Sequence, residues 1–238
     1  MLTSNHRIHG YFIIYAKISQ AYEKFYLKFD DARGIICIYT VRMEKAMKKY
    51  YKFPEGIDSG DFFYCYSPQA KAKIQLSRES DCVMCGYNED TKDYDYLTVI
   101  THEKYKLGTE ISAECSFEHF GAPLLVITDD TWERDGVKLL GLHFEVVAYE
   151  SGVNIWRIER DDTTPRGIKP TLMIHDEFKI EDNSRISIKA RIEEGKIIAN
   201  VNGHESVVTG NDIPSEFHVG FTACEGVNRF YNYSIENN

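Results

Sequence analysis

Residues 141–160 carry the side chains best suited to chemistry. Two alternating runs flank Ser151-Gly152, a dipeptide suited to a tight turn, and this pattern predicts a β-hairpin. Because side chains alternate along a strand, the hairpin has two faces. One face mixes flat rings with an imidazole, a carboxylate, an amide and a guanidinium, from His143, Glu145, Tyr149, Asn154, Trp156 and Arg160. Such a set suits a polyol, so we predict a ligand-binding face here.

The other face of the hairpin has the composition of a sandwich core. It carries the apolar residues Phe144, Val146, Ala148, Val153 and Ile155. With Ser151 and Gly152 as the two loop residues, Tyr149 pairs with Asn154. The alternative interpretation reverses the faces, so that Tyr149 and Trp156 point into the sandwich. The two interpretations differ only in which face is buried.

Composition excludes several classes of partner. With a formal net charge of −9, the protein surface lacks the positive field that binding of a phosphate backbone needs, so we predict no nucleic-acid partner. The apolar run at residues 11–16 is too short for an export signal, and no segment reaches the roughly 20 apolar residues of a membrane helix. We therefore predict a cytoplasmic protein that does not bind membranes.

The cysteines do not indicate a metal or redox site. Without an export signal, the six cysteines are predicted to be reduced thiols. Cys82 and Cys85 form a CxxC pair, but a structural zinc site needs two further ligands and no second pair or His-x3-His follows. We interpret the pair as coincidental and predict no metal and no cofactor.

The first hundred residues give mixed signals. Residues 35–41 form a β-branched run, which predicts a buried strand. Residues 42–52 are rich in helix formers and Pro54 follows them, so we predict a short surface helix. Further short strands are expected at residues 62–66 and 72–76.

From Tyr94 onward, short strands follow one another with polar links. This spacing predicts an all-β, antiparallel two-sheet sandwich. Residues 129–138 and 161–169 are predicted to be long loops. No linker or repeat divides the chain, so we predict one domain over 1–238, with a recognisable sandwich at 96–238 and uncertain strand pairing at 1–95.

Two C-terminal stretches carry a family resemblance. A strand pair is followed by an Asn202-Gly203 turn, and the chain closes with the aromatic strand Phe230-Tyr231-Asn232-Tyr233-Ser234-Ile235. This pattern resembles the concanavalin A-like lectin/glucanase superfamily, the laminin G-like jelly roll, over about residues 98–238. The resemblance implies a jelly-roll fold, but its members include lectins, glycoside hydrolases and protein-binding domains.

The resemblance raises the question of catalysis. A strand like that of the family-16 glucanases would read Glu-x-Asp-x-Glu, with carboxylates about 6–7 Å apart on one face. Here the strand reads Glu145-x-Val147-x-Tyr149, so only the first carboxylate is present. His143 is a candidate base beside Glu145, and Arg160 is the expected salt-bridge partner.

These observations predict non-catalytic binding of a saccharide or small polyol through the aromatic and polar sheet face. A glycoside hydrolase or lyase that uses Glu145 is the first alternative. The second is an intracellular protein-interaction or structural domain with a protein partner.

Overall fold

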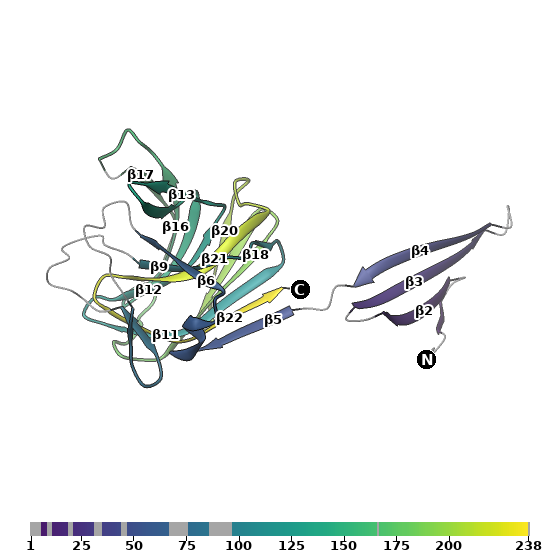
Figure 1. Cartoon of the computed structure of the whole chain (residues 1–238), viewed down its shortest axis with the longest axis horizontal. Coiled ribbons are helices and arrows are strands. Elements are labelled where there is room, and N and C mark those ends of the chain that lie inside the picture. The colour runs from purple at the N-terminus through teal and green to yellow at the C-terminus, as the bar shows by residue number, and fades with distance from the viewer. Residues whose placement is uncertain are drawn as a thin grey trace. The chain divides into compact units, whose positions relative to one another are not determined.

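The computed structural model describes residues 6–8, 11–18, 21–30, 35–43, 47–66, 76–85, 97–165 and 167–237. The chain divides into two compact units, one up to Met47 and one from Lys48 to Asn237 (Figure 1). Among the described residues the only helical element is a single 3₁₀ turn, η1 (Glu55–Asp58). No helix among these residues is long and apolar enough to cross a membrane. The single domain over 1–238 stays a prediction.

The first unit is a four-stranded antiparallel sheet whose strands follow chain order. Its strands are β1 (His6–Ile8), β2 (Tyr11–Ile18), β3 (Ala21–Asp30) and β4 (Ile35–Met43). Their register pairs Ile14 with Phe25, and Phe25 in turn with Thr40. The strand predicted at 35–41 is confirmed as part of β4.

The second unit is a sandwich of two antiparallel sheets. Sheet I has the order β17-β16-β15-β12-β21-β9-β6, and β10 also pairs with β21. Its strands are β6 (Phe62–Tyr66), β9 (Leu97–Thr101), β10 (Tyr105–Lys106), β12 (Ala122–Thr128), β15 (His143–Tyr149), β16 (Gly152–Arg160), β17 (Ile168–Glu177) and β21 (Glu216–Cys224).

Sheet II has the order β20-β19-β18-β11-β22-β8-β7, and β5 also pairs with β22. Its strands are β5 (Met47–Lys52), β7 (Ser77–Arg78), β8 (Val83–Cys85), β11 (Thr109–Glu118), β18 (Ile186–Glu193), β19 (Lys196–Val201), β20 (His204–Thr209) and β22 (Val227–Asn237). The predicted two-sheet antiparallel sandwich is confirmed, including the turn at Asn202-Gly203, where both residues have positive φ (51° and 93°).

The core lies between the two sheets and is rich in aromatic side chains. Phe221 of sheet I packs against Phe230 and Tyr233 of sheet II, with ring centroids 4.6 and 5.4 Å apart. All three side chains are almost fully buried. Burial of such large rings is the main stabilising term for a sandwich of this size.

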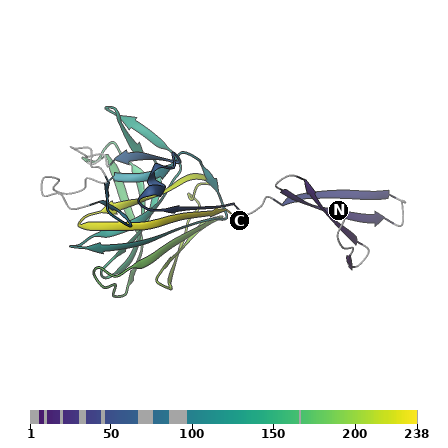
Figure 2. The ribbon, with the colours of Figure 1, turned by 60° about the horizontal axis from the view of Figure 1, so that its bottom comes forward.

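The helix predicted at residues 42–52 is wrong. Residues 47–52 form β5, which runs beside β22, as the blue and yellow strands of Figure 2 show. Tyr51 and the next inward residue, Phe53, are buried in the core, whereas Tyr50 is exposed. This two-residue alternation buries two large rings, and pairing with a distant strand outweighs local helix propensity.

The long loop predicted at 129–138 is also wrong, because it contains a hairpin. Strands β13 (Thr131–Arg134) and β14 (Val137–Leu140) form a separate two-stranded sheet. Asp135 and Gly136 connect them with φ values of 53° and 74°, which is the left-handed geometry of a type I′ turn.

The strand predicted at 72–76 lies largely outside the described residues. The predicted strand at 62–66 is confirmed as β6.

Candidate functional site

The hairpin β15–β16 buries the face that was predicted to be core. Phe144, Val146, Ala148, Val153 and Ile155 are all buried between the sheets. The six candidate site residues therefore lie on the opposite side of sheet I, which we call the outer face. The alternative interpretation, with Tyr149 and Trp156 in the sandwich interior, is wrong.

The predicted register of this hairpin is two residues out. Glu145 pairs with Trp156, and Tyr149 pairs with Gly152 rather than with Asn154. The turn is therefore made by Glu150 and Ser151. Because side chains alternate with a period of two, a shift of two residues keeps every side chain on its face. The faces could be correct although the pairs were not.

A small apolar cluster occupies the centre of the outer face. It consists of Ala122, Leu124, Val126 and Val147, with Leu140, Tyr149, Trp156 and Cys224 packed against them. The first four are buried, while Tyr149 and Trp156 are only partly buried. The cluster supports the two rings from below and leaves part of each exposed to solvent.

Glu145 is paired with His143. The Nδ1 atom of His143 lies 2.8 Å from the carbonyl oxygen of Gly141, and Nε2 lies 3.4 Å from Oε1 of Glu145. A carbonyl only accepts, so Nδ1 of His143 donates this hydrogen bond and Nε2 is the ring nitrogen that faces the carboxylate. The His143 and Glu145 side chains are 8% and 15% exposed. The expected salt bridge from Glu145 to Arg160 is therefore wrong.

Arg160 instead anchors the neighbouring hairpin. Its guanidinium donates to both oxygens of Asp162, at 2.6 to 3.0 Å, and stacks over the ring of Trp132 at 4.2 Å from the centroid. The Trp132 indole nitrogen donates to the carbonyl oxygen of Leu140 at 2.8 Å. Figure 1 accordingly shows β13 next to β16. Arg160 thus links β16 to the β13–β14 hairpin, although its side chain remains 51% exposed.

Trp132 was missed as a site residue. The signal was present, because Asp135-Gly136 between two short alternating runs is a strong indication of a hairpin. The same hairpin brings Lys138 over the ring of Phe63 in β6, 4.4 Å from the centroid. The hairpin therefore contacts the outer face near both β16 and β6.

Tyr149 and Asn154 meet through His175, a second residue that was missed. Nδ1 of His175 lies 2.8 Å from Oδ1 of Asn154 and 3.1 Å from the Tyr149 hydroxyl. Nε2 lies 3.1 Å from Oε1 of Glu177. Partial burial raises the pKa of Tyr149, so its hydroxyl stays protonated at neutral pH.

The accessible part of the outer face lies along β16 and its neighbour β17. Leu172 is directly opposite Trp156 and is 44% exposed, and the His175 side chain is 45% exposed. We call the set Tyr149, Asn154, Trp156, Leu172 and His175 the β16 strip. It combines an aromatic and aliphatic surface with a hydrogen-bonded polar end.

The described residues contain no group of three or more His, Cys, Asp or Glu side chains that could hold a metal ion. Cys65, Cys82 and Cys115 are free thiols. Burial, together with a hydrogen bond to Glu79, raises the pKa of Cys82 to about 12, so this thiol is unreactive at neutral pH. The side chain of Cys85 lies outside the described residues.

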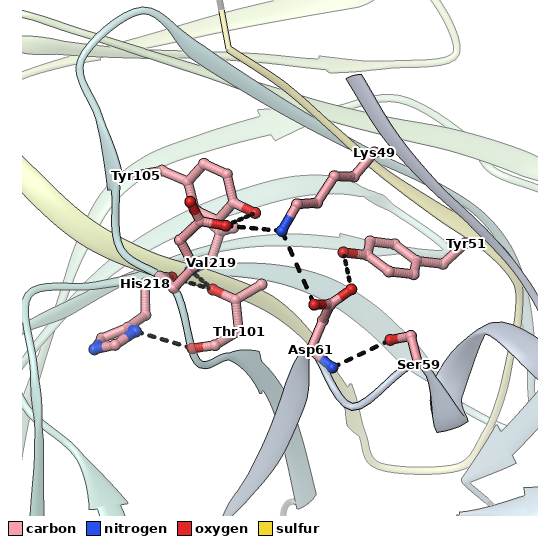
Figure 3. Close-up of polar contacts among 9 residues, drawn as sticks. Lys49, Tyr51, Ser59, Asp61, Thr101, Tyr105, His218 and Val219 are labelled. Carbon is pink, nitrogen blue, oxygen red and sulfur yellow. Dashed lines mark hydrogen bonds and ion pairs between the residues drawn. The ribbon is translucent and has the colours of Figure 1, made fainter. Parts of the chain in front are cut away.

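A second polar cluster lies where β5, β6, β9 and β10 approach one another (Figure 3). The Lys49 ammonium donates to Glu103 at 2.7 Å and lies 4.0 Å from Asp61. The Tyr51 hydroxyl donates to Asp61 at 2.9 Å, and that of Tyr105 to Glu103 at 3.4 Å. We call these five residues the Lys49 cluster.

Charge and burial act together on the pKa values of this cluster. Burial raises the pKa of Tyr51, and the hydrogen bond to Asp61 adds to the shift. Burial likewise raises the pKa of Tyr105. Burial alone would lower the pKa of Lys49, but its contacts with Glu103 and Tyr105 outweigh this effect and raise it. The Lys49 cluster is thus a closed set of mutual contacts.

Comparisons with known proteins establish the fold. No family model matches the chain, and no curated protein matches it. Solved structures do match: β-agarase A from Zobellia galactanivorans has a TM-score of 0.56 at 7% identity, covering 80% of this chain and 93% of that one. The fold is a concanavalin A-like jelly roll.

Two further structures agree with this assignment. A protein of unknown function with a galectin-like fold from Bacillus subtilis has a TM-score of 0.52 at 11% identity, covering 80% of this chain and 94% of that one. The exoplasmic/lumenal domain of VIP36, in its Ca²⁺/Man3GlcNAc-bound form, has a TM-score of 0.50 at 11% identity, and the match covers 81% of this chain and 91% of that one. At these identities the likeness concerns the fold alone.

Proposed function

We propose that this protein binds saccharides without catalysis, through the β16 strip on the outer face of sheet I. The observation that carries the proposal is the partly buried Trp156, which lies outside the sandwich core beside the exposed Leu172. A sugar ring has an apolar face of C–H groups and a rim of hydroxyls. The strip offers a matching arrangement, with apolar surface at Trp156 and polar groups at Tyr149 and Asn154.

Pre-organisation supports this proposal. The Tyr149 hydroxyl and the Asn154 amide are already held by His175 before any ligand arrives. Groups that are fixed in advance lose less conformational freedom on binding. Two fold neighbours also carry names that refer to saccharides or to enzymes that act on them, a β-agarase and the exoplasmic/lumenal domain of VIP36 in its Ca²⁺/Man3GlcNAc-bound form, which is compatible with the same ligand class.

Catalysis is the weaker candidate. Glycoside hydrolysis normally needs two carboxylates that flank one bond. The cross-strand neighbours of Glu145 on the outer face are Val126 and Trp156, and the next outward residues of its own strand are His143 and Val147. None of these four is a carboxylate, and His143 already engages Glu145.

The proposal is tested with a glycan array, followed by calorimetry on the strongest binders. Trp156→Ala should abolish binding, or weaken it at least about 100-fold, because stacking and burial at one aromatic platform contribute a few kcal/mol. Phe120→Ala is the matched control, because Phe120 is an aromatic residue that is 79% exposed at the turn between β11 and β12.

The control variant should bind like the wild type, and both variants should remain folded. Absence of binding to every glycan by the wild-type protein would contradict the proposal. Turnover of a chromogenic glycoside that Glu145→Gln abolishes would replace it with the hydrolase alternative.

A further inference from the structure

His175 faces outward because β17 contains a β-bulge. In β17, Leu172 pairs with Trp156 on the outer face. In a regular strand, a residue three positions later points to the opposite face. The register shifts at this point, however, because Ile155 pairs with Ile174, which leaves one additional residue in β17.

The bulge places two consecutive side chains on one side. Met173 and Ile174 both pack against the sandwich core and both are partly buried. His175 then pairs with Asn154 and points outward. Bulges commonly turn a side chain towards a binding site in this way. Without the additional residue, His175 would face the core of the sandwich.

The outward imidazole organises the polar end of the β16 strip. It contacts the Asn154 amide and the Tyr149 hydroxyl at 2.8 and 3.1 Å, while Glu177 holds its other nitrogen at 3.1 Å. An amide has four hydrogen-bonding positions and a phenol has both a donor and an acceptor. These contacts therefore leave donor and acceptor positions of Asn154 and Tyr149 for a ligand.

Charge around this end of the strip restricts the ligand class. The Glu177 carboxylate is 79% exposed at the side of His175 away from Asn154. An acidic sugar or a sulfate group placed here would meet like charge. Asn154 and Trp156 lie two residues apart on one strand, about 6–7 Å, a distance that one sugar unit can span.

We infer that His175 is a specificity-determining residue of the proposed saccharide site, and that the ligand is a neutral sugar with adjacent hydroxyl groups. The sugar ring packs on Trp156 and Leu172. Two adjacent sugar hydroxyls form hydrogen bonds with Asn154 and Tyr149, whose side chains His175 holds in position. This inference rests on the proposed function. It adds the class of sugar and the residue that selects it.

The test uses panels of neutral gluco-, manno- and agaro-oligosaccharides, the monodeoxy analogue of the best binder, and a uronic acid oligosaccharide. His175→Ala should weaken binding of the best neutral sugar about tenfold and remove its preference over the deoxy analogue. His175→Gln, which keeps a hydrogen-bond donor and an acceptor, should recover part of the affinity and part of the preference over the deoxy analogue. His119→Ala, at an exposed position of the turn between β11 and β12, is the control and should bind like the wild type.

The possible results separate this inference from the proposed function. If His175→Ala binds and discriminates like the wild type while Trp156→Ala does not bind, the inference fails and the proposed function stands. If the wild type binds no saccharide, both fail. Preference for the uronic acid oligosaccharide would overturn the neutral ligand class. Loss of binding together with a fall of several degrees in the melting temperature, shared by His175→Gln, would show a structural role and overturn the assignment of specificity.

Discussion

The β16 strip and the Lys49 cluster combine similar side chains, aromatic rings with polar and charged groups, in opposite arrangements. In the Lys49 cluster the ammonium, the two carboxylates and the two phenols contact one another, and Tyr51 and Tyr105 are 6% and 3% exposed. In the strip, Leu172 and His175 are nearly half exposed. Residue types alone therefore do not identify a ligand face. The Asp61 and Glu103 side chains of the Lys49 cluster are 42% and 51% exposed, so the two regions differ in their rings: Tyr51 and Tyr105 are buried, whereas Tyr149 and Trp156 are partly exposed.

The largest expected effect concerns stability, and it should separate the two regions. Tyr51→Ala removes a buried ring that packs 4.7 Å from Phe62 and 6.4 Å from Tyr233, so it should destabilise the sandwich by about 3–5 kcal/mol. Trp156→Ala, at a partly buried position, should cost only about 1–2 kcal/mol. Chemical denaturation measures both. Equal losses at the two sites would contradict the distinction.

A medium effect is expected at alkaline pH. The pKa values of Lys49, Tyr51 and Tyr105 are all raised in the folded protein. Above pH of about 10 the unfolded chain releases these protons first, so the folded state binds more protons and its stability falls as pH rises. Burial also raises the pKa values of the Cys65 and Cys82 thiols, which the unfolded chain deprotonates from about pH 8.5. Melting temperatures should therefore begin to decline near pH 8.5, and the Lys49 cluster should steepen the decline above pH of about 10.

Tyr51→Phe provides the control for this pH dependence. It removes one titrating group but keeps the ring, so the alkaline decline should become shallower. His175→Ala, in the strip, should leave the slope unchanged. A Tyr51→Phe slope equal to that of the wild type would show that the Lys49 cluster does not govern this titration.

The smallest expected effect tests the position of Arg160 between strip and hairpin. A double-mutant cycle with Arg160→Met and Trp132→Phe should give a coupling free energy of about 0.5–1 kcal/mol, the usual size for an exposed cation–π contact. Arg160→Met should reduce saccharide affinity only a few-fold, because Arg160 supports the hairpin. A loss as large as that of Trp156→Ala would instead make Arg160 a direct ligand contact.

The sequence predicted most of the sandwich because its strands after residue 96 are short, alternating and separated by clear turns. It also predicted the two faces of β15–β16, since alternation alone determines them. The register of β15–β16 could not be predicted from the sequence, because a shift of two residues leaves the pattern of faces unchanged. Only the turn geometry at Glu150 and Ser151 distinguishes the two registers.

The other differences between the sequence-based predictions and the structure came from non-local strand pairing and from irregular strands. Residues 47–52 have helix formers, but β22, which is nearly at the other end of the chain, makes them a strand. His175 could not be placed from alternation, because the bulge at Met173 and Ile174 reverses the pattern. The β13–β14 hairpin was different, since Asp135-Gly136 carried a recognisable signal.

The central claim is that Trp156 lies on an open ligand face and not in a core. The most direct measurement follows the two indole N–H signals by NMR in ¹⁵N-labelled protein, with Trp132→Phe to assign them, while the best neutral oligosaccharide is added. We predict that the Trp156 signal shifts in a saturable way, with a smaller change at Trp132. Saccharide binding that leaves the Trp156 signal unchanged would contradict the account.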